Sequence, residues 1–138
     1  SVYGEGLSTP FLESMPLPGP KSLYAASKVA NELMAANFSL NSDHRRIGLR
    51  FFTVYGPWGR PDMAYFRLMA TALGKHHFKM FGDGSVERDF TYIDDVTEVF
   101  YRSSFKKISN ITLNLCSSNP VKMIDVVNIL FKLFDLQR

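Results

Sequence analysis

The chain has 138 residues, of which 46% are hydrophobic, 14% aromatic and 21% charged. This is ordinary globular composition, and it excludes the disordered, collagenous and disulfide-stapled classes of protein. The formal net charge is +3 and the basic residues are scattered, so we expect no nucleic-acid partner, whereas anionic small molecules suit this charge.

The chain shows no targeting or membrane-spanning segment. No apolar run approaches the roughly 18–20 residues that span a bilayer, so we expect no membrane contact in this segment. The single cysteine, Cys116, cannot form an internal disulfide, which favours a reducing, cytoplasmic compartment. The chain opens at Ser1-Val2-Tyr3-Gly4 with neither a signal peptide nor an initiator methionine, and we expect an internal excerpt of a longer protein.

The first part of the chain is predicted to pass from a loop into a long helix and a buried strand. Ser1 to Tyr3 are typical of a strand end before a turn at Gly4, and four prolines between residues 5 and 22 indicate a loop. Ser22 is predicted to cap a helix over 23–38. Residues 46–55 then resemble one strand, apolar enough on both faces to lie inside a sheet. The apolar face of the helix is predicted at Ala26, Val29, Ala30 and Leu33.

The middle of the chain continues the alternation. Asp62 is predicted to cap a helix that ends near Gly74. Residues 78–81 and 86–93 are typical of two strands around a glycine turn. His76 and His77 lack partners at metal-ligand spacing, so we expect a surface helix end there and predict no metal site.

The last part adds two helices and a strand. Asp94 or Asp95 is predicted to cap a helix that ends near Ser104, residues 111–115 form a short strand, and residues 124–136 form a helix. Since helices alternate with strands, the fold class is α/β. Cys116 is expected to be a small buried residue after a strand. The aromatic residues assigned to the core are Phe100, Phe105, Phe131 and Phe134.

The segment Tyr24-Ala25-Ala26-Ser27-Lys28 is the strongest local motif. Residues four apart lie on one face of a helix, one turn from each other. A lysine ammonium in that position would stabilise the phenolate form of the tyrosine, which makes Tyr24 a candidate general base for a sugar or alcohol hydroxyl. An ordinary amphipathic helix with an exposed lysine can show the same spacing.

Three further segments accompany this motif, in order: Ser1-Val2-Tyr3-Gly4, then Leu49-Arg50-Phe51-Phe52-Thr53-Val54-Tyr55-Gly56-Pro57, then Arg88-Asp89-Phe90-Thr91-Tyr92-Ile93-Asp94-Asp95-Val96. With them, nearly the whole chain resembles the extended short-chain dehydrogenase/reductase family. Within that family it resembles the NAD-dependent nucleotide-sugar epimerase/dehydratase branch, and most of all UDP-glucuronate 4-epimerases.

The resemblance implies the C-terminal portion of a doubly wound Rossmann-type sheet together with part of the small substrate-binding lobe. Residues 1–56 would belong to the NAD-binding domain. Residues 57–138 would belong to the nucleotide-sugar lobe, with some segments returning to the sheet.

The resemblance also implies roles for residues of the first part. Tyr24 would remove a proton from a sugar hydroxyl while hydride passes to NAD, and Lys28 would bind the nicotinamide ribose; both would contact the cofactor, as would Phe51. The family's third catalytic residue, a Ser or Thr, would precede Ser1. The family's glycine-rich NAD fingerprint does not occur in this sequence, so we expect the isolated chain to lack a complete NAD site and to be inactive.

The substrate-binding residues implied by the resemblance are Ser1, Thr53, Arg60 and Arg88. Sugar 4,6-dehydratases usually carry Glu where this chain has Ser1, which has no acid–base capacity near neutral pH and so argues against dehydration. A hydroxyl at Thr53 suits a carboxylated sugar, although a β-branched strand residue needs no such role. Arg88 matches the family arginine at the nucleotide diphosphate, since a guanidinium binds phosphate with two hydrogen bonds. Arg60 would contact the nucleotide or the sugar, or would only pair with Asp62 at the surface.

The function indicated is that of an NAD-dependent nucleotide-sugar 4-epimerase acting on UDP-glucuronate. C4 would be oxidised transiently by hydride transfer to NAD, and the hydride would return to the opposite face. Alternatives are a 4-epimerase of UDP-hexoses or UDP-N-acetylhexosamines, a sugar 4,6-dehydratase, and a non-catalytic nucleotide-sugar-binding fragment. A homodimer is expected, because the family's YxxxK helix packs in a dimer interface.

Overall fold

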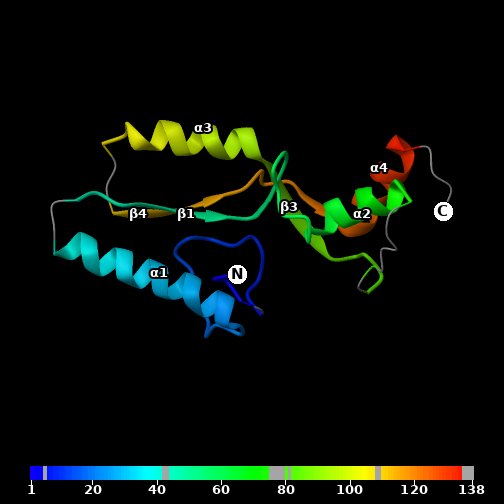
Figure 1. Ribbon diagram of the computed structural model, residues 1–138. Coiled ribbons are helices and arrows are strands. Elements are labelled where there is room, and N and C mark those ends of the chain that lie inside the picture. Colours follow the sequence, from blue (N-terminus) through cyan, green and yellow to red (C-terminus); the bar gives the residue numbers. More distant parts are fainter. Residues whose placement is uncertain (5, 42–43, 75–79, 81, 108–109, 135–138) are drawn as a thin grey trace. The chain divides into compact units, whose positions relative to one another are not determined.

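The computed structural model describes residues 1–4, 6–41, 44–74, 80, 82–107 and 110–134. These residues form two compact units, drawn in Figure 1. The first unit comprises Ser1–Arg50 and Tyr101–Leu115, and the second comprises Phe51–Phe100 and Cys116–Arg138. The elements in chain order are α1 (Leu23–Leu40), β1 (Ile47–Phe51), β2 (Thr53–Tyr55), α2 (Ala64–Ala72), β3 (Glu87–Tyr92), α3 (Ile93–Ser104), β4 (Ile111–Leu115), β5 (Pro120–Lys122) and α4 (Met123–Leu133). The predicted α/β class is confirmed.

The first unit combines a two-stranded sheet with the longest helix of the described chain. β1 pairs with β4, and the amide of Ile111 donates to the carbonyl of Arg46 at 3.1 Å. The predicted strand over 111–115 is confirmed as β4. Helix α1 runs beside β1 and β4 (Figure 1).

Helix α1 begins where the sequence predicts, but its packed side only partly matches the predicted apolar face. The Ser22 hydroxyl accepts a hydrogen bond from the amide of Ala25 at 3.1 Å, so the predicted N-cap is confirmed. The predicted apolar face is correct only in part: Ala26 and Val29 are half-buried, whereas Ala30 and Leu33 are exposed, Leu33 at 67%, and the buried residue of α1 is Ala25. The cause is polar, because the packed side of α1 includes Glu32, whose carboxylate binds Arg50 of β1.

The N-terminal segment is held to the first unit by polar and stacking contacts. Residues 1–4 form a turn in which the amide of Gly4 donates to the carbonyl of Ser1, so the strand predicted there is not present. Tyr3 is buried, stacks on Phe11, and donates its hydroxyl hydrogen to Asn114 of β4. The amide of Asn114 in turn donates to the Glu13 carboxylate at 2.7 Å. The polar and aromatic contacts supply the attachment that strand pairing was expected to supply.

The second unit has a three-stranded sheet in the order β2-β3-β5. β2 and β3 are parallel, with Thr53 opposite Phe90, and β3 and β5 are antiparallel, with Arg88 opposite Val121. The single strand predicted over 46–55 is therefore two strands. The backbone changes sheets at Phe52, since β1 pairs with β4 and β2 pairs with β3. The short strand β5 was not predicted.

Two predicted aspartate caps are wrong. Helix α2 begins after Met63, which makes no side-chain capping bond, and Asp62 instead lies 3.3 Å from Arg60. Helix α3 begins at Ile93, so Asp94 and Asp95 lie within its first turn. Carboxylates in a first turn still stabilise a helix, because the N-terminal end carries a partial positive charge.

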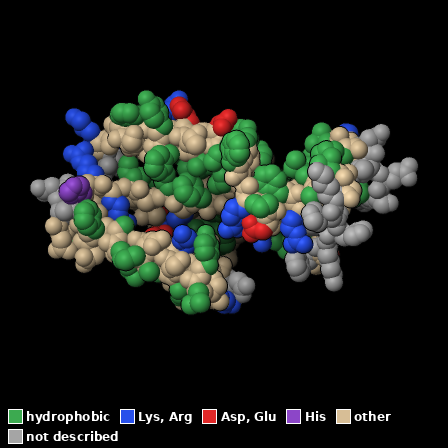
Figure 2. Space-filling view, viewed as in Figure 1, with side chains coloured by type: hydrophobic (Ala, Val, Ile, Leu, Met, Phe, Trp, Pro, Cys, Tyr) green, Lys and Arg blue, Asp and Glu red, His purple; other side chains and the backbone are tan. Residues whose placement is uncertain are grey.

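Several apolar side chains lie on the surface, visible over α1 and α3 in Figure 2. The core assignment of Phe100 and Phe105 is wrong, since they are 64% and 70% exposed, and the buried residue of α3 is Val96. Phe131 and Phe134 are half-buried. Helical spacing shows which side chains lie on the same face of a helix, but it does not show which face packs against the rest of the protein.

Some predictions fall on residues outside the described part. These are the strand over 78–81, of which the structure describes residue 80 alone, and the helix end at His76 and His77. Among the described helices, none is long and apolar enough to cross a bilayer. Cys116 is a free, half-buried cysteine directly after β4, where a buried one was expected.

We predict that the contact between Glu13 and Asn114 is lost at acidic pH. The hydrogen bond from the Asn114 amide holds the pKa of Glu13 below its ordinary value, so the bond contributes stability above the unfolded-state pKa of about 4.3. That contribution disappears as the pH falls through the lower pKa of the folded state. The Asn114 amide signal in ¹H-¹⁵N spectra should titrate below pH 4.3, and Glu13→Gln should abolish this titration. A midpoint above 4.3 would contradict the assignment.

Candidate functional site

Tyr24 and Lys28 lie together on the first two turns of α1. The Ser22 cap fixes the start of the helix, so Tyr24 is its second residue and Lys28 follows one turn later. The Lys28 Nζ lies 5.2 Å from the centroid of the Tyr24 ring, close enough for a cation–π contact. Tyr24 is 61% exposed, so its hydroxyl can receive a ligand. The structure thus brings together the two side chains of the predicted acid–base motif.

Ser1 also belongs to the first unit, but its side chain makes no hydrogen bond with this pair among the described residues. Its carbonyl accepts the amide of Gly4 at 3.3 Å, and the side chain is exposed. Within the described residues, no hydrogen bond links the hydroxyl of Ser1 to Tyr24 or Lys28. The role of Ser1 in substrate binding therefore stays a prediction.

Thr53 and Arg88 share one face of the sheet in the second unit. Thr53 of β2 lies opposite Phe90 of β3, and Arg88 is two residues before Phe90. Because side chains alternate along a strand, these three residues project from the same face. Tyr55, two residues after Thr53, contacts the rings of Phe90 and Tyr92 at 6.2 and 5.4 Å. The face therefore carries a hydroxyl and a guanidinium beside a wall of aromatic rings.

The opposite face of β3 is anchored directly beside Arg88. One carboxylate oxygen of Asp89 accepts hydrogen bonds from the amide and hydroxyl of Ser117 at 2.7 and 3.1 Å. Its other oxygen accepts the amide of Asn119 at 3.0 Å. These bonds hold the segment before β5 against β3. They limit the movement of the strand that carries Arg88, whose own side chain is exposed.

The loop between β2 and α2 carries Arg60 and has little room to move. A Cβ atom on Gly56 would lie 2.5 Å from Ile93, and one on Gly59 would lie 2.5 Å from the Tyr65 hydroxyl. Between these glycines, Trp58 is fully exposed at 101% with a φ of 64°. Only a tightly packed loop holds a non-glycine residue in this left-handed conformation.

Arg60 is accessible to a ligand. It forms an ion pair with Asp62 at 3.3 Å, as the surface alternative predicts, but both side chains are about 70% exposed, so the pair is weak. Arg60 also lies near Tyr65 of α2. Burial raises the pKa of Tyr65, and the positive charge of Arg60 acts in the opposite direction. An exposed pair of this kind can exchange its carboxylate for a ligand anion.

The candidate residues are distributed over the two units. Ser1, Tyr24 and Lys28 belong to the first unit, and Phe51, Thr53, Arg60 and Arg88 belong to the second. Phe51 ends β1 and is half exposed. Sequence reasoning did not single out Tyr65, which lies near Arg60, or the ion pair between Glu32 of α1 and Arg50. For the ion pair, the available signal was the position of Glu32, four residues after Lys28.

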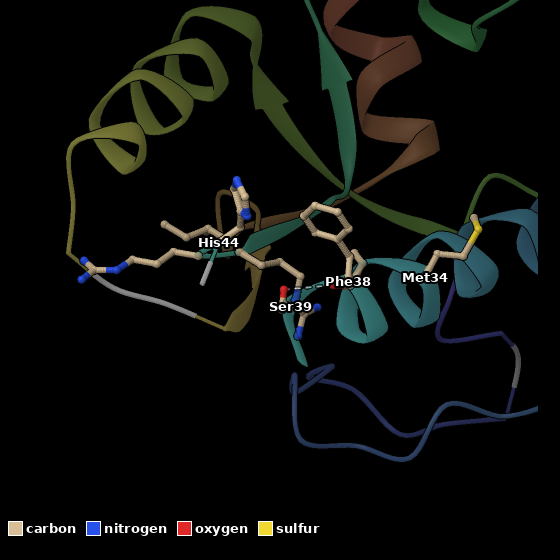
Figure 3. A pocket seen from close by; sticks show the side chains of 8 residues that line it. Met34, Phe38, Ser39 and His44 are labelled. Carbon is tan, nitrogen blue, oxygen red and sulfur yellow. Dashed lines mark hydrogen bonds between the residues drawn. The ribbon is translucent and has the colours of Figure 1, made fainter. Parts of the chain in front are cut away.

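A shallow groove lies at the far end of α1, shown in Figure 3. Met34, Phe38 and Ser39 contribute from α1 and His44 from the segment before β1, and the Ser39 hydroxyl donates to the Ala35 carbonyl. Phe38 follows Tyr24 by 14 residues, which is about 21 Å along a helix. The groove is therefore separate from the Tyr24–Lys28 pair. The described part of the chain holds no cluster of three side chains suited to a metal ion.

Comparison with known proteins identifies the family. Residues 1–116 match the NAD dependent epimerase/dehydratase family. The chain belongs to this family. It is 42% identical over 132 residues to an uncharacterized protein, MJ1055, of Methanocaldococcus jannaschii, covering 96% of this chain and 40% of that protein. It is 40% identical over 153 aligned positions to UDP-glucuronate 4-epimerase 2 of Arabidopsis thaliana, covering 99% of this chain and 35% of that protein.

The solved structures of this family agree with the fold. A UDP-glucuronic acid 4-epimerase from Bacillus cereus, in complex with UDP-glucuronic acid and NAD, is 34% identical with a TM-score of 0.88. The alignment covers 99% of this chain and 44% of that one. The predicted Rossmann-type epimerase/dehydratase fold is confirmed. The chain spans less than half the length of each of these epimerase/dehydratase relatives.

We predict that Gly59→Ala destabilises the second unit through crowding. The added methyl group would meet Tyr65 and Phe66 at 2.5 and 2.6 Å, and overpacking of this kind costs about 1–3 kcal/mol. Gly19→Ala is the matched control, because a Cβ there meets nothing within 4 Å, and its effect should stay within about 0.5 kcal/mol. Urea unfolding of the three proteins measures both values. Equal stability of the two variants would show that the loop yields to the methyl group.

Proposed function

We propose that this chain is the part of an NAD-dependent nucleotide-sugar 4-epimerase that carries its acid–base motif, and that the substrate is UDP-glucuronate. The observation that carries the proposal is the Tyr24–Lys28 pair on α1, in a chain of the epimerase/dehydratase family. Two relatives, the UDP-glucuronate 4-epimerases of Arabidopsis thaliana and Bacillus cereus, support the choice of sugar.

In this proposal Tyr24 is the general base and acid. Its phenolic oxygen takes the proton of the sugar C4 hydroxyl and later returns a proton to the same oxygen in the inverted sugar. The Lys28 ammonium, 5.2 Å from the ring centroid, stabilises the negative charge that develops on the phenolic oxygen. The exposure of Tyr24 gives the hydroxyl of a ligand direct access.

The residues present fit the nicotinamide end of NAD. Tyr24 and Lys28 offer a hydroxyl and an ammonium, and neither side chain is committed to an ion pair in the described part of the chain. They would hold the ribose, and the half-exposed Phe51 is a further candidate contact for the cofactor. NAD, when bound, would supply the reversible hydride acceptor that inversion at C4 needs. The sequence holds no G-x-G-x-x-G segment for the pyrophosphate, so these residues account for one end of the cofactor only.

The second unit would bind the nucleotide sugar. Arg88 projects from the same sheet face as Thr53, and an exposed guanidinium can bind a diphosphate with two hydrogen bonds. Arg60 would add a second cation by exchanging Asp62 for the ligand. Two guanidinium groups on the diphosphate leave the sugar itself as the part that can turn.

A carboxylated sugar is favoured by the hydroxyl groups of two candidate substrate-binding residues. The hydroxyl of Thr53 can donate a hydrogen bond to a carboxylate, as can that of Ser1. Ser1 offers no acid or base for the elimination step of a 4,6-dehydratase. The main alternative is an epimerase that acts on a neutral UDP-hexose or a UDP-N-acetylhexosamine.

We also propose a cytoplasmic homodimer. The apolar side chains Leu33, Met34 and Phe38 of α1 are each more than 60% exposed, and in the family that this chain resembles the YxxxK helix packs in a dimer interface. Cys116 has no partner cysteine, which suits a reducing compartment.

The proposed substrate predicts unequal binding of two sugars. In calorimetric titrations, UDP-glucuronate should bind more tightly than UDP-galactose. Thr53→Val removes the hydroxyl at similar shape and should weaken UDP-glucuronate binding about tenfold, since a hydrogen bond to a charged group contributes about 1.5–3 kcal/mol. Its effect on UDP-galactose should be small. Arg88→Met should weaken both ligands alike, because both carry the diphosphate.

Titration with NAD distinguishes a fragment that only binds the nucleotide sugar from a chain that also binds the cofactor. Sugar binding without NAD binding would fit a nucleotide-sugar-binding fragment, and NAD binding would call for turnover assays at once. Equal affinities for the two sugars, unchanged by Thr53→Val, would sink the assignment of UDP-glucuronate.

The proposed dimer predicts an effect of charge on α1. Met34→Glu should convert a dimer to a monomer in light scattering at low micromolar concentration, because it places a carboxylate in the apolar surface. Leu12→Glu is the control, since Leu12 is comparably exposed at 51% but lies outside α1. A monodisperse monomer of the unmodified protein would count against the interface.

A further inference from the structure

Three residues of α1 repeat at intervals of one turn: Tyr24, Lys28 and Glu32. Lys28 stands between the other two, four residues from each, so its ammonium can reach a phenol on one side and a carboxylate on the other. Opposite charges at this spacing attract each other. Glu32 is therefore a built-in competitor for the lysine that the proposed chemistry assigns to Tyr24.

The structure shows the carboxylate of Glu32 occupied elsewhere. Arg50 of β1 donates its Nε hydrogen to one carboxylate oxygen and an Nη2 hydrogen to the other, each at 2.8 Å. The side chain of Arg50 is 10% exposed and that of Glu32 is 26% exposed, so water screens the pair little. Within the described residues, Glu32 forms its ion pair with Arg50 and not with Lys28.

Arg50 is itself fixed in place on a further side. Its Nη1 donates to the Tyr3 hydroxyl at 2.9 Å, and its guanidinium carbon lies 5.0 Å from the centroid of the Tyr3 ring. Tyr3 is buried and is tied to Asn114 of β4. Because Tyr3 holds the guanidinium in place, the Glu32 carboxylate would have to give up both hydrogen bonds to Arg50 in order to reach Lys28.

We propose that Arg50 is a positioning residue that withholds the Glu32 carboxylate from Lys28 and so leaves the lysine ammonium to Tyr24. This inference rests on the proposed function, in which Tyr24 and Lys28 perform the acid–base step. A lysine at position 50 would serve less well, because a single ammonium does not bind both carboxylate oxygens in a planar fork.

The test is a rescue experiment with two substitutions. In Arg50→Gln of the full-length enzyme that contains this chain, the freed carboxylate should pair with Lys28. The kcat should then fall by up to about a hundredfold, which is what a displacement of a catalytic group by about 1 Å can cost. The KM for the nucleotide sugar should change little. Adding Glu32→Gln removes the competing charge, and the double variant should recover most of the lost kcat. A purely structural role for Arg50 predicts no recovery, since the second substitution removes one more polar contact.

A second readout needs neither cofactor nor turnover. The Lys28 side-chain ¹⁵Nζ signal should be nearly unchanged in Glu32→Gln, should shift in Arg50→Gln, and should return in the double variant. If Arg50→Gln does not fold, Arg50→Lys takes its place with a smaller expected shift, and the comparison of the unmodified protein with Glu32→Gln still applies. A large shift of the Lys28 signal in Glu32→Gln alone would overturn the inference, as would an unrescued double variant. Absence of turnover by the full-length enzyme that contains this chain would instead reject the proposed function, and the ¹⁵Nζ result would still test the role of Arg50.

Discussion

The bridge between Arg50 and Glu32 is the contact on which the first unit depends. It joins α1 to β1 with two short hydrogen bonds, and Tyr3 extends it to the N-terminal turn and to Asn114 of β4. Three segments distant in sequence thus meet at one guanidinium, and Tyr3 links a fourth, β4, to them. Because Glu32 lies on α1 one turn after Lys28, the bridge also sets the rotation of the helix about its axis. The orientation of Tyr24 and Lys28 follows from that rotation.

The helices were predictable in position but not in orientation. Ser22 identifies the start of α1 through its short polar side chain, a local effect that sequence contains. The packed side of α1 was not predictable, because it follows a charged residue whose partner lies 18 residues away. Asp62 shows the same limit, since Arg60 takes the carboxylate that was expected to cap α2. Local rules fail where a long-range or competing partner binds the same group.

The candidate site also has a part that the sequence predicts and a part that it does not. Tyr24 and Lys28 follow from one helix and its spacing, so the sequence predicts their proximity. The common face of Thr53 and Arg88 depends on the register between β2 and β3, which a single sequence does not encode locally. The order of motifs points to the family. The need for glycine at positions 56 and 59 of the Arg60 loop could not be predicted, because it depends on side chains that pack against them in the folded structure.

The exposed indole of Trp58 has a practical consequence for spectroscopy. It is the single tryptophan of the chain and already faces water when the protein is folded. Its emission would therefore change little as either unit unfolds. A melting curve recorded by tryptophan fluorescence would then show no unfolding transition even though the protein unfolds. The buried ring of Tyr3 offers a better probe, through near-ultraviolet circular dichroism of the tyrosine bands. An emission change on adding a ligand would, by the same reasoning, report on the loop around Trp58 alone.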